Sequence, residues 1–224
     1  LMFGFTMLIF FFSTYKTVDL TFPKIITSGV IAYNIAMFFH TLTADGMNLL
    51  QRYSENESIA FYLIGNMMLL SSLIIAFLSR VKNMNLRGIN ITITIFFVVS
   101  MFLTFMNVTP VLYDGDYTII RSIVEIVILT GFIAGLILLS YNKEAYTKIF
   151  FTDVMTFIIL LLLSEVLFTI IRTPGDILYS AAHIIRLIAM FTIMMALIQE
   201  YISKPFDASI IDLSGELDVL KQSF

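Results

Sequence analysis

The chain has 224 residues, of which 59% are hydrophobic and 13% are charged, and its mean hydropathy is +0.95. This composition excludes an ordinary soluble domain and indicates a protein that lies in a lipid bilayer. The net charge of −3 argues against a nucleic-acid partner, which would require a basic patch. Because the chain contains no cysteine, disulfides, thiolate metal sites and a cysteine nucleophile are also excluded.

Seven segments are apolar enough to be predicted as membrane-spanning helices. A helix needs about 20 mostly apolar residues to cross the hydrocarbon core, where every backbone polar group has to be satisfied internally. In chain order the predicted spans are Leu1 to Tyr15, Lys24 to Ala44, Ser58 to Ser79, Gly88 to Val108, Tyr117 to Tyr141, Tyr146 to Ile171, and Ile177 to Tyr201. The first span is short and the chain opens on leucine, so we expect residue 1 to lie inside a longer protein. The sequence therefore predicts an all-α polytopic bundle of about seven transmembrane helices, the first of them truncated.

The basic residues gather on one side of this seven-span arrangement. Nine of the 13 fall there: Lys16, Lys24, Arg80, Lys82, Arg87, Lys143, Lys148, Lys204 and Lys221. Arg186 lies within the last span. The opposite side has only Arg52, Arg121 and Arg172, together with the acidic loop residues Asp45, Glu55, Glu57, Asp114, Asp116 and Asp176. Because lysine and arginine are retained on the cytoplasmic side of a membrane, we predict that the N-terminus lies outside and the C-terminus lies in the cytoplasm.

The segment 203–224 differs in composition from the membrane domain predicted over residues 1–202. From the membrane exit onward the sequence reads KPFDASIIDLSGELDVLKQSF, in which polar and apolar residues are mixed. Leu213, Leu217 and Leu220 recur at helical spacing among charged residues, which predicts a short amphipathic helix. One interpretation is a plain terminal tail. The other, which we favour, is a connector helix that leads to a cytoplasmic output module.

Ionisable residues within the predicted spans gather in the outer third of the membrane. Each such group costs about 3 kcal/mol at the bilayer centre and is retained mainly where it is paired or used. The spans place six of them at similar depth: His40, Arg121, Glu125, Glu165, His183 and Arg186. Residues three or four positions apart share a helix face, so Arg121 projects with Glu125 and His183 with Arg186. We predict a ligand-sensing cavity built from these residues and from Asp45, with Asn66 somewhat deeper.

Several of these residues also have a plainer explanation. Arg121 and Glu125 could form an intrahelical ion pair that only makes a polar helix end tolerable, and His40 could be a neutral imidazole bonded to a carbonyl. Glu165 is different, because no basic residue lies within one turn of it on its own helix. Its partner is expected to come from another span, and Arg186 or His183 is the natural choice.

Five short motifs in this chain resemble those of a known family. They are FFHTLTADGM around His40, DYTIIRSIVEIVI around Arg121 and Glu125, SEVLFT around Glu165, AAHIIRLIAMF around His183, and KPF at the membrane exit. In this order, over nearly the whole chain, they resemble the third type of bacterial membrane-associated sensor domain (MASE). Domains of that type are found at the N-terminus of histidine kinases and diguanylate cyclases.

The chain departs from the family pattern at a few positions. Where the family has His-Thr followed by Tyr-Lys-Gly-Met, this chain has Ala44 and Asp45 before Gly-Met. Ala182 replaces a usual glycine, and Arg186 and Arg121 stand where lysine is commoner. The change from a basic residue to Asp45 bears on the identity of the ligand, while the architecture is expected to carry over.

The resemblance implies a non-catalytic input domain in a bacterial or archaeal inner membrane. It would receive an unknown small-molecule or physical stimulus and relay it through the last span to a covalently linked kinase or cyclase, within a homodimer. No cofactor is required by this interpretation. Two alternatives remain. One is a haem or metal ion bound by His40 and His183, and the other is a small transporter in which Glu125, Glu165 and the two histidines relay protons. No inverted repeat, HExxH motif, nucleophile elbow or mid-span lysine supports transport or intramembrane catalysis.

Overall fold

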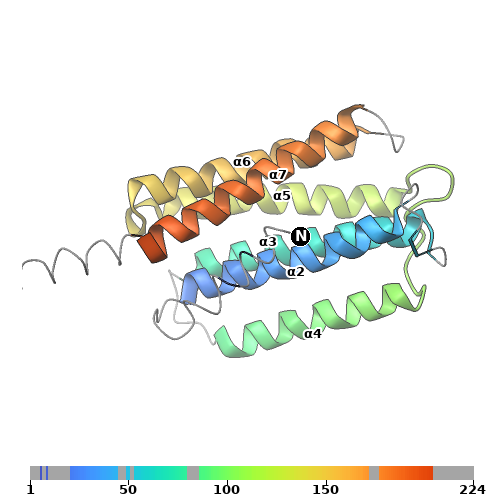
Figure 1. The fold of residues 1–224 in the computed structure, drawn as a ribbon, viewed down its shortest axis with the longest axis horizontal. Coiled ribbons are helices and arrows are strands. Elements are labelled where there is room, and N and C mark those ends of the chain that lie inside the picture. The colour runs from blue at the N-terminus through green and yellow to red at the C-terminus, as the bar shows by residue number, and fades with distance from the viewer. Residues whose placement is uncertain are drawn as a thin grey trace, which may run out of the picture.

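The computed structural model describes residues 21–44, 49–50, 53–79, 86–171 and 177–203, together with residues 6 and 9. Within these ranges the regular structure is helical (Figure 1). The α-helices are α2 (Thr21–Thr43), α3 (Glu55–Ser79), α4 (Leu86–Phe105), α5 (Ile119–Tyr141), α6 (Lys148–Ile170) and α7 (Ile177–Ile198). A 3-10 turn, η1 (Lys143–Ala145), joins α5 to α6, and a π-helical segment, η2 (Gln199–Ser203), continues α7.

The second to seventh predicted spans each correspond to one of these helices. The predicted first span, Leu1 to Tyr15, lies outside the described residues apart from positions 6 and 9, and so does the connector after Ser203. Among the described helices, α2, α3, α5, α6 and α7 are long and apolar enough to cross a membrane. For α4 the apolar stretch found among the described residues is shorter, Ile91–Phe105.

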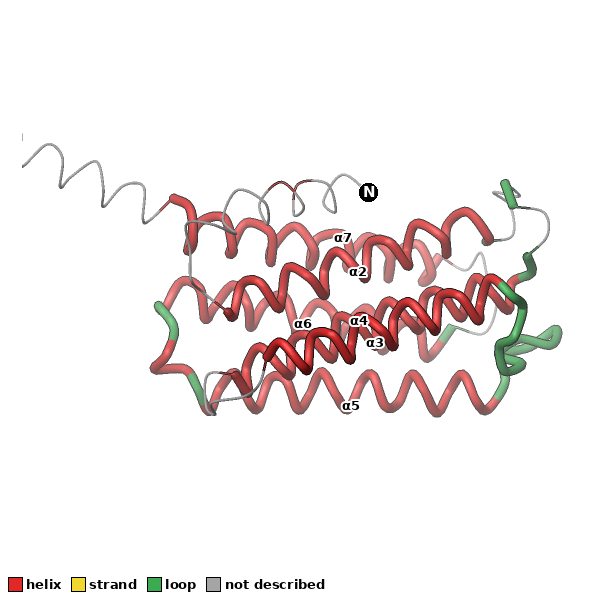
Figure 2. The backbone as a smooth tube through the Cα atoms, turned by 90° about the horizontal axis from the view of Figure 1, so that it is seen from below, coloured by secondary structure: helices red, strands yellow, loops and turns green. Residues whose placement is uncertain are grey.

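The helices lie side by side along the long axis of the molecule (Figures 1 and 2). The closest packing is between α2 and α3 and between α6 and α7, which form two helix pairs. Helix α5 packs against both α3 and α6 and so joins the pairs, while α4 lies on the far side of α3. Much of the apolar surface of α4 is exposed, for example at Ile95, Phe96 and Val98, as expected for a helix that faces lipid.

Small residues allow α2 and α3 to approach each other closely. A Cβ atom added at Gly29 would lie 1.8 Å from the hydroxyl oxygen of Ser72, and one added at Gly65 would lie 3.1 Å from the Cβ of Ala36. Glycine and alanine at helix interfaces in membranes permit such contacts between backbones. The contact fixes the register of the pair and brings His40, near the end of α2, to the first turns of α3.

Helix α3 begins at Glu55, three residues earlier than predicted. The carboxylate of Glu57 accepts hydrogen bonds from the backbone N–H of Ser54 at 2.8 Å and from its hydroxyl at 2.5 Å, which caps the helix start. Glu55 and Glu57, which the loop pattern assigned to the outer surface, therefore lie in the first turn of α3, and both are largely buried.

The segment between α4 and α5 is folded against the same end of the bundle. Asn56 of α3 donates from its side-chain amide to the hydroxyl of Thr109 at 2.9 Å, and its side-chain oxygen accepts from the backbone N–H of Leu112 at 2.6 Å. A bridge between Tyr113 and Tyr117 closes the segment into a short hairpin. These contacts deliver Tyr117 to the end of the bundle where α2, α4 and α6 finish (Figure 1).

The predicted orientation can be tested cleanly because the chain has no cysteine. Asp114→Cys places a thiol at the end of the bundle that carries the hairpin, and Lys143→Cys places one at the opposite end; both positions are exposed. If the hairpin end lies outside, a membrane-impermeant maleimide added to intact cells should label Asp114→Cys, and should label Lys143→Cys only after permeabilisation. The converse pattern of labelling would reverse the orientation.

Candidate functional site

The polar residues predicted within the spans meet at the hairpin end of the bundle, as far as the structure describes them. They come from four helices: His40 from α2, Arg121 and Glu125 from α5, Glu165 from α6, and His183 and Arg186 from α7. All are buried except His183, which is partly exposed. Asp45, the remaining predicted site residue, lies outside the described residues.

Glu165 and Arg186 form a buried ion pair between α6 and α7. The guanidinium of Arg186 donates to the carboxylate of Glu165, and the hydroxyl of Tyr62 on α3 donates to the same carboxylate oxygen at 2.9 Å. Close by, the hydroxyl of Ser164 donates to the backbone oxygen of Ala182 at 3.0 Å. Glu165 thus finds its partner on another helix, as the sequence predicts, and that partner is Arg186.

Aromatic rings pack around this ion pair, which uses only part of its hydrogen-bonding capacity. The guanidinium carbon of Arg186 lies 5.0 Å from the ring centre of Tyr62 and 5.2 Å from that of Phe168. Within the described part of the chain, one carboxylate oxygen of Glu165 and two guanidinium nitrogens of Arg186 have no hydrogen-bond partner. Asn66, one turn deeper than Tyr62 on α3, is fully buried and its amide is likewise without a partner there. The polar interior therefore extends one turn below the pair.

Arg121 and Glu125 form a second ion pair, within α5. The Nε of Arg121 donates to the carboxylate of Glu125 at 2.7 Å, and its Nη2 donates to the backbone oxygen of Phe168 at 3.3 Å. The guanidinium carbon lies 3.2 Å from the ring centre of Tyr117. Burial raises the pKa of the Tyr117 hydroxyl, against the opposing effect of the Arg121 charge, so this hydroxyl stays neutral. Arg121 does more than neutralise a helix end, because it connects α5 to α6 and to the hairpin.

His40 joins the end of α2 to the start of α3. Its Nδ1 lies 2.8 Å from the backbone oxygen of Ser58 and 3.0 Å from the hydroxyl oxygen of the same residue. A protonated Nδ1 donates to the backbone oxygen, whereas an unprotonated Nδ1 accepts from the hydroxyl. The rings of His183 and His40 are stacked, with their centres 6.1 Å apart. Tyr179 and Phe168 pack against the His183 ring, with ring centres 4.5 and 4.9 Å from its centre.

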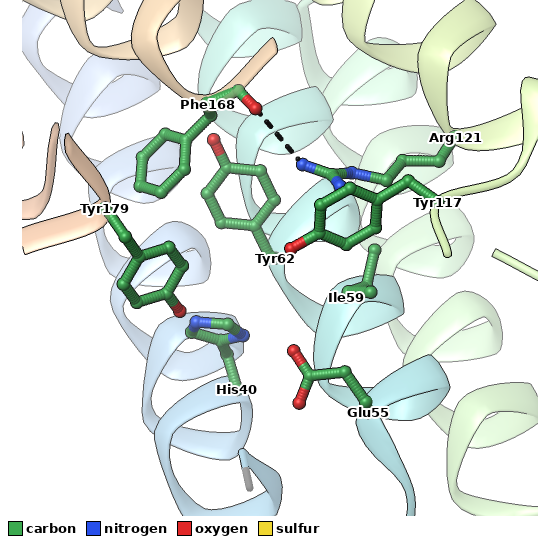
Figure 3. A pocket seen from close by; sticks show the side chains of 8 residues that line it. All are labelled: His40, Glu55, Ile59, Tyr62, Tyr117, Arg121, Phe168 and Tyr179. Atoms are coloured by element: carbon green, nitrogen blue, oxygen red, sulfur yellow. Dashed lines mark hydrogen bonds between the residues drawn. The ribbon is translucent and has the colours of Figure 1, made fainter. Parts of the chain in front are cut away.

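A pocket opens among these side chains (Figure 3). Its walls are His40, Glu55, Ile59, Tyr62, Tyr117, Arg121, Phe168 and Tyr179. The volume of this cavity is about 20 Å³, which is enough for one or two water-sized molecules. Because the walls come from both helix pairs and from the hairpin, this pocket lies where the halves of the bundle meet.

A second, larger hollow lies on the other side of Arg121. Its volume is about 220 Å³, and it is lined by Asp116, Tyr117, Arg121, Ser122, Glu125, Thr169 and Ile171. Arg121 and Tyr117 line both hollows and form the wall between them. The stacked guanidinium and ring thus separate a small aromatic pocket from a more polar one.

Sequence reasoning missed the tyrosines and Glu55. Tyr62, Tyr117 and Tyr179 carry no charge, and Glu55 was assigned to a loop because the start of α3 was placed too late. Helical spacing holds one signal that was available, since Tyr179 lies one turn before His183 on the same helix face.

Aromatic rings pack against the two histidines of the haem alternative. The ring centre of Tyr62 lies 5.7 Å from that of His40, and those of Phe168 and Tyr179 lie 4.9 and 4.5 Å from that of His183. Over the described ranges, no group of three or more histidine, aspartate or glutamate side chains is arranged to hold a metal ion. The alternative stays a prediction that an absorption spectrum can test, because bound haem gives a Soret band.

Removal of one member of the buried ion pair should cost more stability than removal of both. Glu165→Leu leaves the charge of Arg186 buried without its partner, which typically destabilises a protein by about 3–5 kcal/mol. Combining Glu165→Leu with Arg186→Met removes that stranded charge, so the double variant should recover part of the loss. The free energy of unfolding of the purified protein in mixed micelles measures both. A double variant less stable than Glu165→Leu would contradict this account.

Comparison with known proteins gives one match. The family model described as a membrane-associated sensor domain, MASE3, matches residues 1–205 of the chain. No curated protein and no solved structure matches it. The resemblance seen in the sequence motifs is thereby confirmed.

Proposed function

Because the chain belongs to the MASE3 family of membrane-associated sensor domains, we propose that it is the signal-input domain of a bacterial signal-transduction protein. A stimulus acts on the polar residues at the hairpin end of the bundle, which are His40, Arg121, Glu125, Glu165, His183 and Arg186, together with Asp45, which the sequence predicts for the same site. The resulting change in helix packing passes through α7 to a histidine kinase or diguanylate cyclase module in the cytoplasm. The domain itself catalyses no reaction.

One hydrogen-bonded chain supports this proposal above all. Tyr62 lines the pocket, its hydroxyl donates to Glu165, and Glu165 pairs with Arg186 on α7. A ligand or a physical change that moves the ring of Tyr62 therefore alters the surroundings of a buried charge pair on the last helix. Charges in a buried, poorly polarisable site respond strongly to such changes.

The two helix pairs provide a mechanical basis for relay. Helices α6 and α7 are hydrogen-bonded near both ends, by Ser164 to the backbone of Ala182 and by Thr147 to Glu200 of η2. We propose that these two helices move as one body relative to α2 and α3. The pocket lies between the bodies, so its occupant changes their separation.

An aromatic cluster at the opposite end would act as the pivot. The ring of Phe22, at the start of α2, lies 6.0 Å from that of Phe77 on α3 and 5.9 Å from that of Phe150 on α6. Tyr201, in η2 after α7, packs against Phe150 at 5.8 Å. Because the pairs are joined here by buried rings, we propose that rotation about this end converts a change at the pocket into a tilt of α7.

The proposal includes an orientation, a membrane and an oligomeric state. The hairpin end faces outside and η2 faces the cytoplasm of a bacterial or archaeal inner membrane, in line with the distribution of lysine and arginine. The domain acts as a homodimer, because kinase and cyclase outputs work across a two-fold axis. Substrates of the output module do not enter this domain.

The relay is tested by removing a single hydroxyl. Tyr62→Phe keeps the ring but deletes the hydrogen bond to Glu165, and we expect a change of about 1 kcal/mol in the balance of signalling states, or about fivefold in their ratio. The output of the natural full-length protein, or of a fusion to a reporter kinase or cyclase, is measured at matched protein levels. Tyr53→Phe is the control, because the Tyr53 hydroxyl also donates a hydrogen bond at this end, to the backbone oxygen of Phe105, but Tyr53 does not line the pocket.

Two further variants complete the test. Glu165→Ala and His183→Ala should also alter the output while the protein still inserts into the membrane, because both side chains lie on the α6–α7 body next to the pocket. Normal output in these variants and in Tyr62→Phe would overturn the cavity as the sensing site.

A further inference from the structure

Helix α7 does not end as an ordinary α-helix. The segment η2 (Gln199–Ser203) continues it with π-helical hydrogen bonds, which join each N–H to the carbonyl oxygen five positions earlier instead of four. A turn of this kind contains one residue more than an α-helical turn. Turns of this kind are rare and are frequently found at functional sites. The last described turn of the chain therefore carries an extra residue just before the connector.

The extra residue corresponds to a defined rotation of the chain that follows. In an α-helix, one residue accounts for about 100° of rotation and about 1.5 Å of rise, because there are 3.6 residues per turn. If η2 rewound into α-helical register, the chain after Ser203 would turn by about 100° about the helix axis and move by about 1.5 Å along it. Such a change can occur while the rest of α7 keeps its own register.

Contacts to the start of α6 hold η2 in its present register. The ring of Tyr201 is buried and packs against that of Phe150, with their centres 5.8 Å apart. At the N-cap of α6, the hydroxyl of Thr147 donates to the carboxylate of Glu200 at 2.9 Å. Rewinding would displace Tyr201 and Glu200 relative to α6. The π-helical register is therefore supported by side chains as well as by the backbone.

The sequence after η2 disfavours the α-helical register at this point. Pro205 stands four positions after Tyr201. In an α-helix, the ring of a proline clashes with the carbonyl oxygen four positions before it, which here is that of Tyr201. A wider turn relieves such a clash. The two registers are therefore closer in free energy at this place than within α7.

The segment η2 is also connected to the contact between the helix pairs. Phe150, which supports Tyr201, packs against Phe22 of α2 with ring centres 5.9 Å apart. Movement of α6 and α7 relative to α2 therefore changes the packing of the ring that holds η2. We infer that η2 is a two-state register switch, which converts movement between the helix pairs into rotation of the chain leading to the output module. This inference rests on the proposed function, since it names the step that follows the tilt of α7.

Spin-label distances measure the register on the full chain in nanodiscs. Lys143→Cys, at an exposed position in η1, and Asp207→Cys, four residues beyond η2, each receive a nitroxide, because the chain has no cysteine of its own. A rotation of about 100° moves a side-chain end about 5 Å from the helix axis by about 8 Å. A second pair with Ala208→Cys in place of Asp207→Cys reports on another direction. Labelled chains are diluted with unlabelled ones, so that distances within one chain are measured.

Two variants of Tyr201 test the contact that holds the register. Tyr201→Ala deletes the ring and introduces a strong α-helix former, so we expect at least one of the two distances to shift by several ångströms. Tyr201→Phe keeps the ring against Phe150 and should leave both distances unchanged. The same distances in Tyr201→Ala as in Tyr201→Phe would overturn the inference.

Deletion of Gln199 tests the extra residue without removing the ring. Gln199 is exposed, and its removal converts η2 into an α-helical turn that leaves Tyr201 and the following chain in place. We therefore expect the distances of the undeleted chain, and we expect them to persist when Tyr201→Ala is added, because no extra residue remains to be released. In an ordinary α-helix the same deletion rotates the following chain by about 100°. A shift of the distances by this deletion alone would overturn the inference.

The output of the natural full-length protein separates this inference from the proposed function. Tyr201→Ala should change the output, and addition of the Gln199 deletion should restore it. If the distances stay constant in Tyr201→Ala while Tyr62→Phe still changes the output, the register switch is wrong and the input function stands. If the distances shift while the output does not, the role of η2 in signalling is overturned.

Discussion

The buried ion pair between Glu165 and Arg186 constrains the rest of the half of the bundle that carries the hairpin. Two charges removed from water are tolerated only when each is close to the other and surrounded by groups that compensate the loss of hydration. Here the compensation comes from the hydroxyl of Tyr62 and from the rings of Tyr62 and Phe168. Helices α3, α6 and α7 must therefore meet at one depth, and any change in their packing acts on the pair.

The position of the pocket follows from this requirement that α3, α6 and α7 meet at one depth. The ring that shields the pair on one side, Tyr62, lines the pocket on the other, and the same holds for Phe168. The backbone oxygen of Phe168 also accepts from Arg121, so the second ion pair is tied to the same turn of α6. Two charge pairs and the pocket thus share their supporting side chains, and an occupant of the pocket contacts the groups that stabilise both.

The sequence predicts much of this arrangement because of the high cost of charge in a membrane. Glu165 has no base within a turn, which required a partner on another helix, and the depth of Arg186 made it a natural choice. Helix order was beyond reach, since it depends on contacts such as Gly29 against Ser72 that no spacing rule reveals. The tyrosines were also missed, because a neutral aromatic residue is interpreted as part of the hydrophobic core until its neighbours are known. Asn56 is not marked by the sequence either, yet its side chain holds the hairpin that carries Tyr117.

Because the bundle is divided into two helix pairs, a change at the pocket can alter how the pairs pack against each other. A site inside one tightly packed pair would have little effect on the other, because close packing such as that of α2 on α3 resists small displacements. The pocket instead lies between the pairs, and the rings of Phe22, Phe77 and Phe150 join them at the far end. In the proposed relay, a small change at the pocket becomes a tilt of α7 about that cluster. The last helix is thereby suited to carry the signal, because its outer end forms part of the pocket and its inner end leads towards the cytoplasm in the proposed orientation.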